Sequence, residues 1–525
     1  MRFYELSTVL TYCKDPSALL VLTMSLLAAQ PCKLNGRVSI CKDDRTRLVD
    51  RTVKNASGYL ADTSFDIKSY DICVREPQKS LDFCGSIEYD DSMERNAISR
   101  LMQWQKSASR KPLVMQGARQ VGKTWLLKEF GAHSYRNVAY INFEANDRMT
   151  SLFMANLDIE RLLIGLRVEA SCPIEPENTL IIFDEVQENP KALAALKYFS
   201  ELAPAYHVAA AGSLLGIAMH AGTSFPVGKV DFIHLHPLSF DEFLLALGEV
   251  ESAGILRTGE WPMLDLFRDR YVELLRYYYC VGGMPEAVAT FVAGRDMHAV
   301  REAQRRLLAS YEQDFSKYAE PRVVPRIRAV WDSIPSQLAR EQRKFVYGLV
   351  REGARAREYE LAIAWLCDAG LLHKVHRVSK PGLPLKAYKD ANAFKLFMHD
   401  TGLLAAHANI PVQALLRGNA LFEEFKGALT EQYVSQELRL LEDMDVCYWS
   451  SESSQAELDF VFQYGTGVYP LEVKAAENLQ AKSLRVYNEK YRPPRCFRAS
   501  LSAYRKETWL TNLPLYALSR LPGET

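Results

Sequence analysis

The sequence predicts an α/β fold, and three features of the chain indicate it. A glycine-rich loop at 117–124 lies between a short apolar segment and a segment of helical spacing. A second apolar run, 179–183, ends in two adjacent carboxylates, Asp184 and Glu185. Further β-rich runs, such as 138–143, alternate with helix-like segments. Short apolar strands separated by helices are typical of a parallel sheet with helices on both faces.

Length and composition limit the possible classes of protein. The chain has 525 residues, enough for two to four domains with substantial cores. Lys and Arg together number 64, as do Asp and Glu, so no overall positive field attracts nucleic acid, and any such contact must come from a local patch. Hydrophobic residues make up 48% and charged residues 24%, values typical of globular proteins. No apolar run reaches the length of a membrane span.

Residues 1–92 show little regular patterning, and two explanations for them stay open. They are a poorly ordered extension, or the native chain begins at Met93 and the preceding sequence is translated in error, which is the explanation we favour. The apolar run 18–29 has the length of a signal-peptide core, but Asp15 precedes it and we expect no export. No C-x-x-C pair occurs in the chain, so neither a zinc site nor a redox pair is indicated.

The loop at 117–124 follows the pattern G-x-x-x-x-G-K-T of a phosphate-binding loop. Its glycines let backbone N–H groups surround phosphate oxygens, and the N-terminus of the next helix adds partial positive charge. Lys123 would reach the β and γ phosphates of ATP, and the Thr124 hydroxyl would hold Mg²⁺. Gly131 is expected to end this helix. The predicted nucleotide-binding residues are Gly117, Ala118, Arg119, Gln120, Val121, Gly122, Lys123 and Thr124.

Two further strand ends supply candidates for catalysis. Ligands gather at the carboxyl ends of strands in open α/β sheets. Asp184 would hold Mg²⁺ through its water shell, and Glu185 would orient and polarise the attacking water. The alternative is an ordinary strand end whose acids face solvent. Ser213, after the strand 207–211, is a candidate sensor of the γ-phosphate, although Gly-Ser also ends many strands.

The elements after these strands follow from capping and periodicity. Pro190 suits the first turn of a helix at 191–202. A strand is expected at 230–235, and Ser239 to Glu242 forms a capping box for a helix at 240–247. The pattern from 261 to 318 is helical with a break at 281–285.

These motifs, in this order, resemble the prokaryotic AAA-type ATPases that carry a C-terminal domain of unknown function with a restriction-endonuclease-like fold. The resemblance runs from about Met93 to the C-terminus and implies a P-loop AAA-type αβα core with a helical lid. The family often has Arg where this chain has Lys229, and lysine lacks the planar fork of an arginine finger. No finger is therefore assigned. The motifs are Gly117–Thr124, Phe183–Gln187, Ala211–Ser213, Phe225–Val230, Pro237–Phe243 and Gly282–Glu286.

The segment 321–400 has the order of a winged helix. A helix is expected at 358–369, followed by strands at 371–378 and 385–389 that a Lys-Pro-Gly turn joins. The cations before this helix could contact DNA phosphates. Equally, interleaved glutamates could make this a solvated, salt-bridged face. The cations are Arg340, Arg343, Lys344, Arg351, Arg355 and Arg357.

The C-terminal segment has the order of residues found in PD-(D/E)xK nucleases. Glu431 lies in an amphipathic helix, Asp459 begins a strand, and Glu472 and Lys474 share one face of the next strand. Asp459 and Glu472, with Glu431 as an optional third ligand, would bind Mg²⁺, and Lys474 would stabilise or deprotonate the water that attacks a phosphodiester. The alternatives are a hairpin with surface charges or a nuclease fold that only binds.

We therefore predict a cytoplasmic, Mg²⁺-dependent ATPase whose nucleotide state controls a C-terminal half that engages DNA. The alternative is an ATP-dependent protein-interaction switch with an inactive nuclease-fold module. No membrane contact is expected. The predicted domains are the extension 1–92, the ATPase core 93–240, a helical lid 241–320, a winged-helix-like segment 321–400 and a restriction-endonuclease-like domain 401–525.

Overall fold

The chain forms two separate units, Met1–Ser86 and Ile87–Thr525. In the first unit, strands β1 (Cys32–Leu34) and β2 (Arg37–Ser39) pair antiparallel. The rest of 1–92, and with it the prediction made for this segment, lies outside the described residues. The computed structural model describes residues 32–34, 37–39, 94–213, 215–218, 226–340, 343–417, 423–441, 443–451, 456–475 and 481–525.

The predicted parallel sheet is confirmed in the first part of the second unit. Its five strands have the order β4-β5-β6-β3-β7, and every neighbouring pair is parallel. The strand β5 is buried along its whole length, as expected for the centre of a sheet that is covered on both faces. The strands are β3 (Leu113–Gln116), β4 (Asn137–Asn142), β5 (Thr179–Asp184), β6 (His207–Ala211) and β7 (Asp231–His234).

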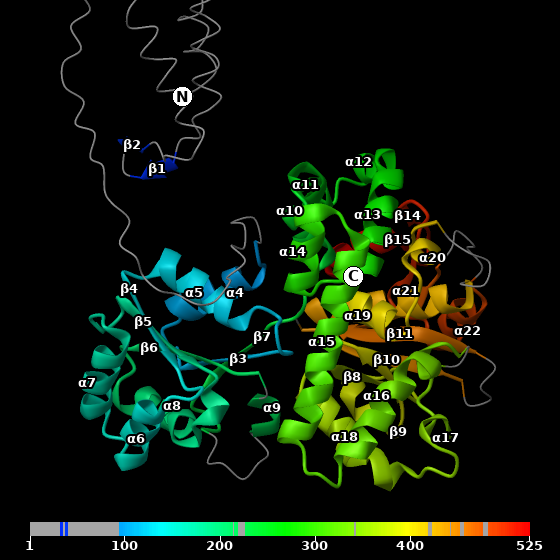
Figure 1. Cartoon of the computed structure of the whole chain (residues 1–525). Coiled ribbons are helices and arrows are strands. Elements are labelled where there is room, and N and C mark those ends of the chain that lie inside the picture. Colours follow the sequence, from blue (N-terminus) through cyan, green and yellow to red (C-terminus); the bar gives the residue numbers. More distant parts are fainter. Residues whose placement is uncertain are drawn as a thin grey trace, which may run out of the picture. The chain divides into compact units, whose positions relative to one another are not determined.

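Helices cover both faces of this sheet, as Figure 1 shows. Alternate residues of β5 point to opposite sides: Leu180 packs in one apolar cluster with Leu126, and Ile181 packs in the other with Leu196. The first cluster includes α4 (Ala97–Lys106) and α5 (Lys123–Ser134). The second includes α6 (Asp147–Ala155), α7 (Ile159–Ala170) and α8 (Pro190–Leu202).

Capping explains several of the helix boundaries. The Asn189 side chain accepts hydrogen bonds from the first turn of α8, with Pro190 at the first helical position as predicted. The capping box before α10 (Phe240–Ala246) is also present. The predicted end of α5 at Gly131 is wrong, because the helix continues to Ser134. Gly131 is instead a packing position, since a Cβ there would lie 2.8 Å from Val138 Cγ2.

Helices follow the core, with the predicted break at 281–285. Two glycines form the break: Gly282 has φ +74°, and a Cβ on Gly283 would lie 2.1 Å from the carbonyl oxygen of Leu238. The lid function of this segment stays a prediction. The helices are α11 (Val250–Thr258), α12 (Trp261–Leu266), α13 (Arg268–Val281), α14 (Pro285–Gly294), α15 (Met297–Tyr318) and α16 (Val324–Leu338); the short α9 (Leu215–Ala218) lies within the core.

The remaining strands form one eight-stranded sheet of order β14-β15-β13-β12-β11-β10-β8-β9. They are β8 (Leu372–Val378), β9 (Lys389–Met398), β10 (Asp445–Ser450), β11 (Glu457–Tyr464), β12 (Gly467–Val473), β13 (Cys496–Ser500), β14 (Arg505–Lys506) and β15 (Leu510–Pro514). The associated helices are α17 (Tyr347–Val350), α18 (Ala356–Asp368), α19 (Thr401–His407), α20 (Val412–Arg417), α21 (Glu423–Leu440) and α22 (Lys482–Tyr491). Apolar residues of α21 and α22 pack on this sheet in separate clusters, with Tyr433 in one and Tyr487 in the other.

This sheet corrects one prediction and bears on another. The predicted strand 385–389 is wrong, because Leu385–Tyr388 forms a 3₁₀ turn and the strand that pairs with β8 begins at Lys389. The predicted boundary between 321–400 and 401–525 stays a prediction, but one sheet extends across it. β8 pairs in parallel with β10, with His376 opposite Cys447, so the expected wing is part of the C-terminal sheet. Across the described helices, none combines the length and apolar character that a membrane crossing requires.

Candidate functional site

The loop between β3 and α5 has the backbone geometry that its glycines predict. Gly117 has φ +147° and Gly122 has φ +97°, both in the region that favours glycine. A Cβ on Gly117 would lie 2.2 Å from the carbonyl oxygen of Leu235. Any larger residue would therefore push the loop away from the end of β7. The sequence places the loop at the N-terminus of α5, where backbone N–H groups are free to face an anion.

Lys123 is buried at the centre of this loop, with 6% of its surface exposed. Its ammonium donates hydrogen bonds to the carbonyl oxygens of Gly117 at 2.9 Å and Ala118 at 2.8 Å. Burial lowers the pKa of Lys123 to about 8, although Glu185 and Asp184 oppose this shift. The ammonium is therefore charged at neutral pH and is held by the loop that would surround the phosphates.

Asp184 and Thr124 meet at the end of β5, as predicted. The Thr124 hydroxyl lies 3.0 Å from both carboxylate oxygens of Asp184. The Tyr140 hydroxyl donates a further hydrogen bond of 2.8 Å to Asp184 Oδ2, and its pKa is raised by burial and then by Asp184. A hydroxyl and a carboxylate in contact are the oxygen donors that suit Mg²⁺ at this kind of site. These residues therefore fit the ion.

Glu185 is the second acid of this strand end and is held by two neighbours. Ser213 Oγ lies 3.1 and 3.3 Å from the two carboxylate oxygens, and Gln187 Nε2 donates to Oε2 at 2.5 Å. A Cβ on Gly212 would lie 2.0 Å from Gln187 Oε1, so this glycine makes room for the amide. The structure thus joins the predicted sensor Ser213 to the predicted water-orienting acid. Gln187 was part of a recognised motif but was not predicted as a site residue.

A cavity of about 420 Å³ brings these residues together. Its walls include Lys123, Thr124, Asp184, Glu185 and Ser213, together with residues that sequence reasoning missed. The missed residues are Arg95, Trp125, Gly212, Pro285 and Glu286.

The missed residues reach the cavity from outside the core strands. Pro285 and Glu286 belong to the Gly282–Glu286 motif, which was recognised in the sequence but not assigned to the nucleotide cavity. Arg95 lies just before α4 and had no signal. It is 6% exposed and donates to Glu242 Oε1 at 3.3 Å, to the Val121 carbonyl at 3.2 Å and to the His236 carbonyl at 2.6 Å.

Arg119, for which the sequence suggested no role, connects the loop to the helices after the core. Its guanidinium forms an ion pair of 2.5 Å with Asp314 of α15. Burial lowers the pKa of Arg119, but the hydrogen bond and charge of Asp314 outweigh that effect and raise it. The Tyr311 hydroxyl, one turn earlier on α15, donates a hydrogen bond of 3.1 Å to the carbonyl oxygen of Arg119. Both the side chain and the backbone of this loop residue are thus bound to α15.

The predicted C-terminal acids also lie close together. Asp459 on β11 follows the register that places Phe460 opposite Leu471 on β12, so it lies beside Glu472. Asp459 Oδ2 accepts a hydrogen bond of 2.7 Å from the Val473 backbone N–H. Burial raises the pKa of Asp459 well above its usual range, and the neighbouring Glu431 of α21 raises it further.

Three cations neutralise these acids. Arg343 forms an ion pair with Glu431 Oε1. Lys395 of β9, 1% exposed, lies 3.7 Å from Glu431 Oε2 and 2.8 Å from Glu457. Lys474 lies 2.7 Å from Glu472 Oε1. Burial would raise the pKa of Glu431, but Lys395 and Arg343 lower it. Lys395 was not predicted as a site residue, because it lies in a strand whose start was predicted at the wrong position.

These acids do not fit a divalent metal ion in this arrangement. Protein cations already balance their charge, and in this group the buried acceptors that lack a hydrogen bond, among the residues that the structure describes, are Glu431 Oε2 and Glu472 Oε2. Lys395 lies close to the first of these oxygens. Within the described parts of the chain, no group of three or more His, Cys, Asp or Glu side chains is arranged to hold a metal. The predicted nuclease role of Glu431, Asp459, Glu472 and Lys474 stays untested.

Comparison with protein families gives three matches along the chain. Residues 109–244 match the family described as AAA domain. Residues 272–414 and 426–518 match two domains of unknown function, DUF8612 and DUF4143. With the loop, the parallel sheet and the acids at the end of β5, the first match shows that residues 109–244 form a P-loop AAA-type ATPase domain. A comparison with curated proteins found no match.

Several solved structures are similar to this chain at low identity. A Walker-type ATPase of Pyrococcus abyssi is 15% identical over 60% of this chain and 95% of its own, with a TM-score of 0.36. The ORC1 protein of Aeropyrum pernix, in complex with DNA, is 13% identical over 61% and 93%, with a TM-score of 0.25. Cdc6p from Pyrobaculum aerophilum is 11% identical over 63% and 97%, with a TM-score of 0.26. At these scores the likenesses carry no argument about this chain.

Proposed function

We propose that the chain is a Mg²⁺-dependent ATPase whose nucleotide state controls its C-terminal half. One observation carries the first part: Lys123, Thr124, Asp184, Glu185 and Ser213 line a single cavity beside a glycine-rich loop. Each of these side chains has a charge or a donor that suits triphosphate hydrolysis, and they come from three separate segments of the core.

The residues divide the chemical work among them. Lys123 binds the β and γ phosphates, and the backbone N–H groups of the loop bind the remaining oxygens. Thr124 and Asp184 would hold Mg²⁺, which supplies charge neutralisation at the phosphates. Glu185 orients the attacking water and accepts its proton. Ser213 and Gln187 bind the carboxylate of Glu185, so either can report the γ-phosphate to the acid.

A substitution of the water-orienting acid tests this assignment. Glu185→Gln should retain ATP and lose turnover, by about 10²–10⁴-fold, because general base catalysis contributes that much. Glu188→Gln is the matched control: this exposed acid lies three residues later and faces the Tyr318 hydroxyl. It should hydrolyse ATP at the wild-type rate. Wild-type turnover by Glu185→Gln would show that another residue orients the water.

Contacts between the ATPase domain and the following residues support control of the C-terminal half. Arg119 is bound to Asp314, as described above. A Cβ on Gly370 would lie 3.2 Å from the Ala118 backbone nitrogen. A Cβ on Gly216, just after the sensor loop, would lie 2.1 Å from the Asp368 carbonyl oxygen. The loop that binds phosphate and the loop that senses it are thus both packed against α15 or α18.

DNA is the partner that we propose for the C-terminal half. The support is a set of exposed cations near α17 and α18, namely Arg340, Lys344, Arg351 and Arg357. A filter-binding assay with duplex DNA, with and without ATP, tests this proposal. Retention that falls with salt and depends on nucleotide supports it, and salt-independent absence of retention contradicts it.

The second candidate is a protein-interaction switch in which the C-terminal module has no nuclease activity. It is favoured by one observation, the neutralisation of the acids by Arg343, Lys395 and Lys474. Supercoiled plasmid with Mg²⁺ or Mn²⁺ discriminates the two. Nicking by the wild type that disappears in both Asp459→Ala and Lys474→Ala would establish a nuclease. Intact plasmid in all three samples supports the inactive module.

A further inference from the structure

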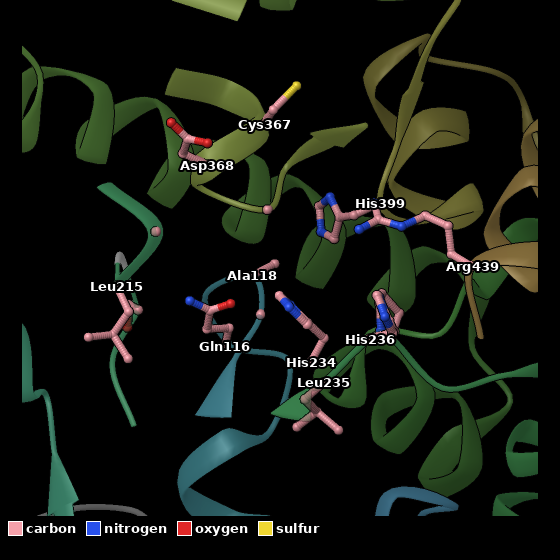
Figure 2. A pocket seen from close by; sticks show the side chains of 15 residues that line it. Gln116, Ala118, Leu215, His234, Leu235, His236, Cys367, Asp368, His399 and Arg439 are labelled. Atoms are coloured by element: carbon pink, nitrogen blue, oxygen red, sulfur yellow. The ribbon is translucent and has the colours of Figure 1, made fainter. Parts of the chain in front are cut away.

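A second cavity, of about 260 Å³, borders the phosphate-binding loop (Figure 2). Its walls include Gly117 and Ala118 of that loop, the end of β7, the end of α18 and Arg439 of α21. Ser213 lines both this cavity and the nucleotide cavity. The two spaces thus share Ser213 and border the same loop, whereas His234, His236 and Arg439 of the second one have no part in the proposed hydrolysis.

Arg439 has no counter-charge in this cavity. Among the described residues, the structure gives its guanidinium neither an ion pair nor a hydrogen bond, and Figure 2 shows it directed toward His399. Desolvation by the surrounding protein lowers the pKa of Arg439, and the nearby Cys367 opposes this shift without cancelling it. Asp368 also lines the cavity, but on the side away from Arg439 (Figure 2). Arg439 is exposed to solvent, so an anion from solution can reach its guanidinium, beside which no protein acid lies among the described residues.

One acid on the adjoining surface, Glu242, is already bound. Arg439 also borders a neighbouring cavity whose walls include Glu242. Glu242 Oε1 accepts from Arg95 at 3.3 Å and from the Asn96 backbone N–H at 2.6 Å, and its Oε2 accepts from the Ser239 N–H at 2.8 Å. This carboxylate is thus neutralised elsewhere and leaves Arg439 unpaired.

Two imidazoles at the end of β7 add hydrogen-bond donors to the same cavity. His234 and His236 are stacked with ring centroids 6.5 Å apart, and no hydrogen bond of either ring is recorded among the described residues. Burial lowers the pKa of both rings, and Arg439 lowers it further. Each ring is therefore neutral at pH 7 and offers one N–H group. His399 is different, because its nitrogens face the Leu371 carbonyl oxygen and the Tyr311 hydroxyl.

We propose that this cavity binds a phosphate group, either free or carried by a small ester. The planar fork of Arg439 would bind two phosphate oxygens, and N–H groups of His234 and His236 would bind the others. Donors that come from two directions suit a tetrahedral anion better than a flat carboxylate. The volume lies just below the range of drug-sized ligand pockets, so the rest of the ligand is small.

Thermal unfolding of the Lys123→Ala variant tests this proposal without interference from the nucleotide site. Inorganic phosphate, titrated at constant ionic strength, should raise the unfolding midpoint in a saturable way, because it binds only the folded chain. Adding Arg439→Met should weaken the apparent affinity about tenfold or more, since a charge-assisted fork is lost. The same substitution should not lower the midpoint measured without phosphate, because Arg439 is exposed and its guanidinium has no ion pair or hydrogen bond to lose among the described residues. Arg439→Lys should show intermediate affinity.

Controls separate this site from general effects of the anion. Arg322→Met, at an exposed arginine that pairs with Glu320, should leave the phosphate response unchanged. A second arm uses glycerol 3-phosphate, and a response to it shows that the site accepts esters. A third arm uses succinate, and an equal or stronger response to this dicarboxylate would overturn the assignment. An unaltered phosphate response in Arg439→Met, or no response in Lys123→Ala, would also overturn it.

Discussion

Lys395 is the residue on which the charge balance of the C-terminal acids depends most. It is 1% exposed and lies 2.8 Å from Glu457 and 3.7 Å from Glu431. Lys395→Met keeps the length of the side chain and removes its charge. Arg343 is then the one cation left beside Glu431, and Glu457 loses the cation beside it. Breaking a buried ion pair in this way costs about 3–5 kcal/mol, and the partial exposure of Glu457 places the expected loss near the lower value.

Urea unfolding followed by circular dichroism measures this loss, with the Lys395→Met/Glu431→Gln double variant completing a cycle. The double variant should recover about 1–3 kcal/mol, because it removes the acid that was left unpaired. Lys386→Met is the control, since this exposed lysine pairs with Asp445 at the surface and should cost about 1 kcal/mol or less. A loss below about 1 kcal/mol for Lys395→Met would refute the reasoning. The reasoning would also be refuted if Mg²⁺ stabilised the wild type against urea and the Asp459→Ala substitution abolished this effect.

Three further predictions concern the phosphate-binding loop. Gly117→Ala should abolish ATP retention in equilibrium dialysis while circular dichroism stays unchanged, because the new Cβ would meet the Leu235 carbonyl at 2.2 Å; normal retention would contradict this. Bound phosphate favours protonated Lys123, whose pKa is about 8 when free, so ATP affinity should fall up to tenfold per pH unit above pH 8. A flat profile in the wild type, like that expected for Lys123→Arg, would be inconsistent with it. Asp314→Asn should preserve ATP binding but abolish any nucleotide-dependent change in limited proteolysis of the C-terminal half, and a persisting change would argue against Arg119 as the link.

The parts of the site that the sequence could predict are the local ones. The glycine-rich loop, Asp184 and Glu185 each lie within a few residues of the strand that positions them. Their chemistry follows from residue type and from the rule that ligands gather at strand ends. Ser213 was predicted for the same reason, and its hydrogen bonds to Glu185 are in the structure.

The residues that the sequence could not predict come from distant segments. Arg95 precedes the loop, and Asp314 lies almost two hundred residues after it, so no local pattern connects either residue to the nucleotide. The sequence offers many other basic residues that could pair with Glu242, and many other acidic residues that could pair with Arg119. Tertiary packing alone selects the pairs.

The C-terminal sheet was misplaced for a related reason. The strand β9 begins with the polar segment 389–392, which hid its alternation, whereas Leu385–Tyr388 has the apolar character of a strand and forms a 3₁₀ turn. The sequence order of helix, helix and hairpin suggested a winged helix. It carried no signal that β8 would pair in parallel with β10, some seventy residues later. Non-local pairing of this kind is not visible in periodicity.

Equilibrium dialysis with labelled ATP and Mg²⁺ tests the central claim most directly, because every step of the proposed mechanism begins with the triphosphate in the loop. The wild type should retain ATP, and Lys123→Ala should bind it on the order of a hundredfold more weakly, since two or more charge-assisted hydrogen bonds are lost. Equal retention by the two proteins, or none by the wild type, would contradict the account.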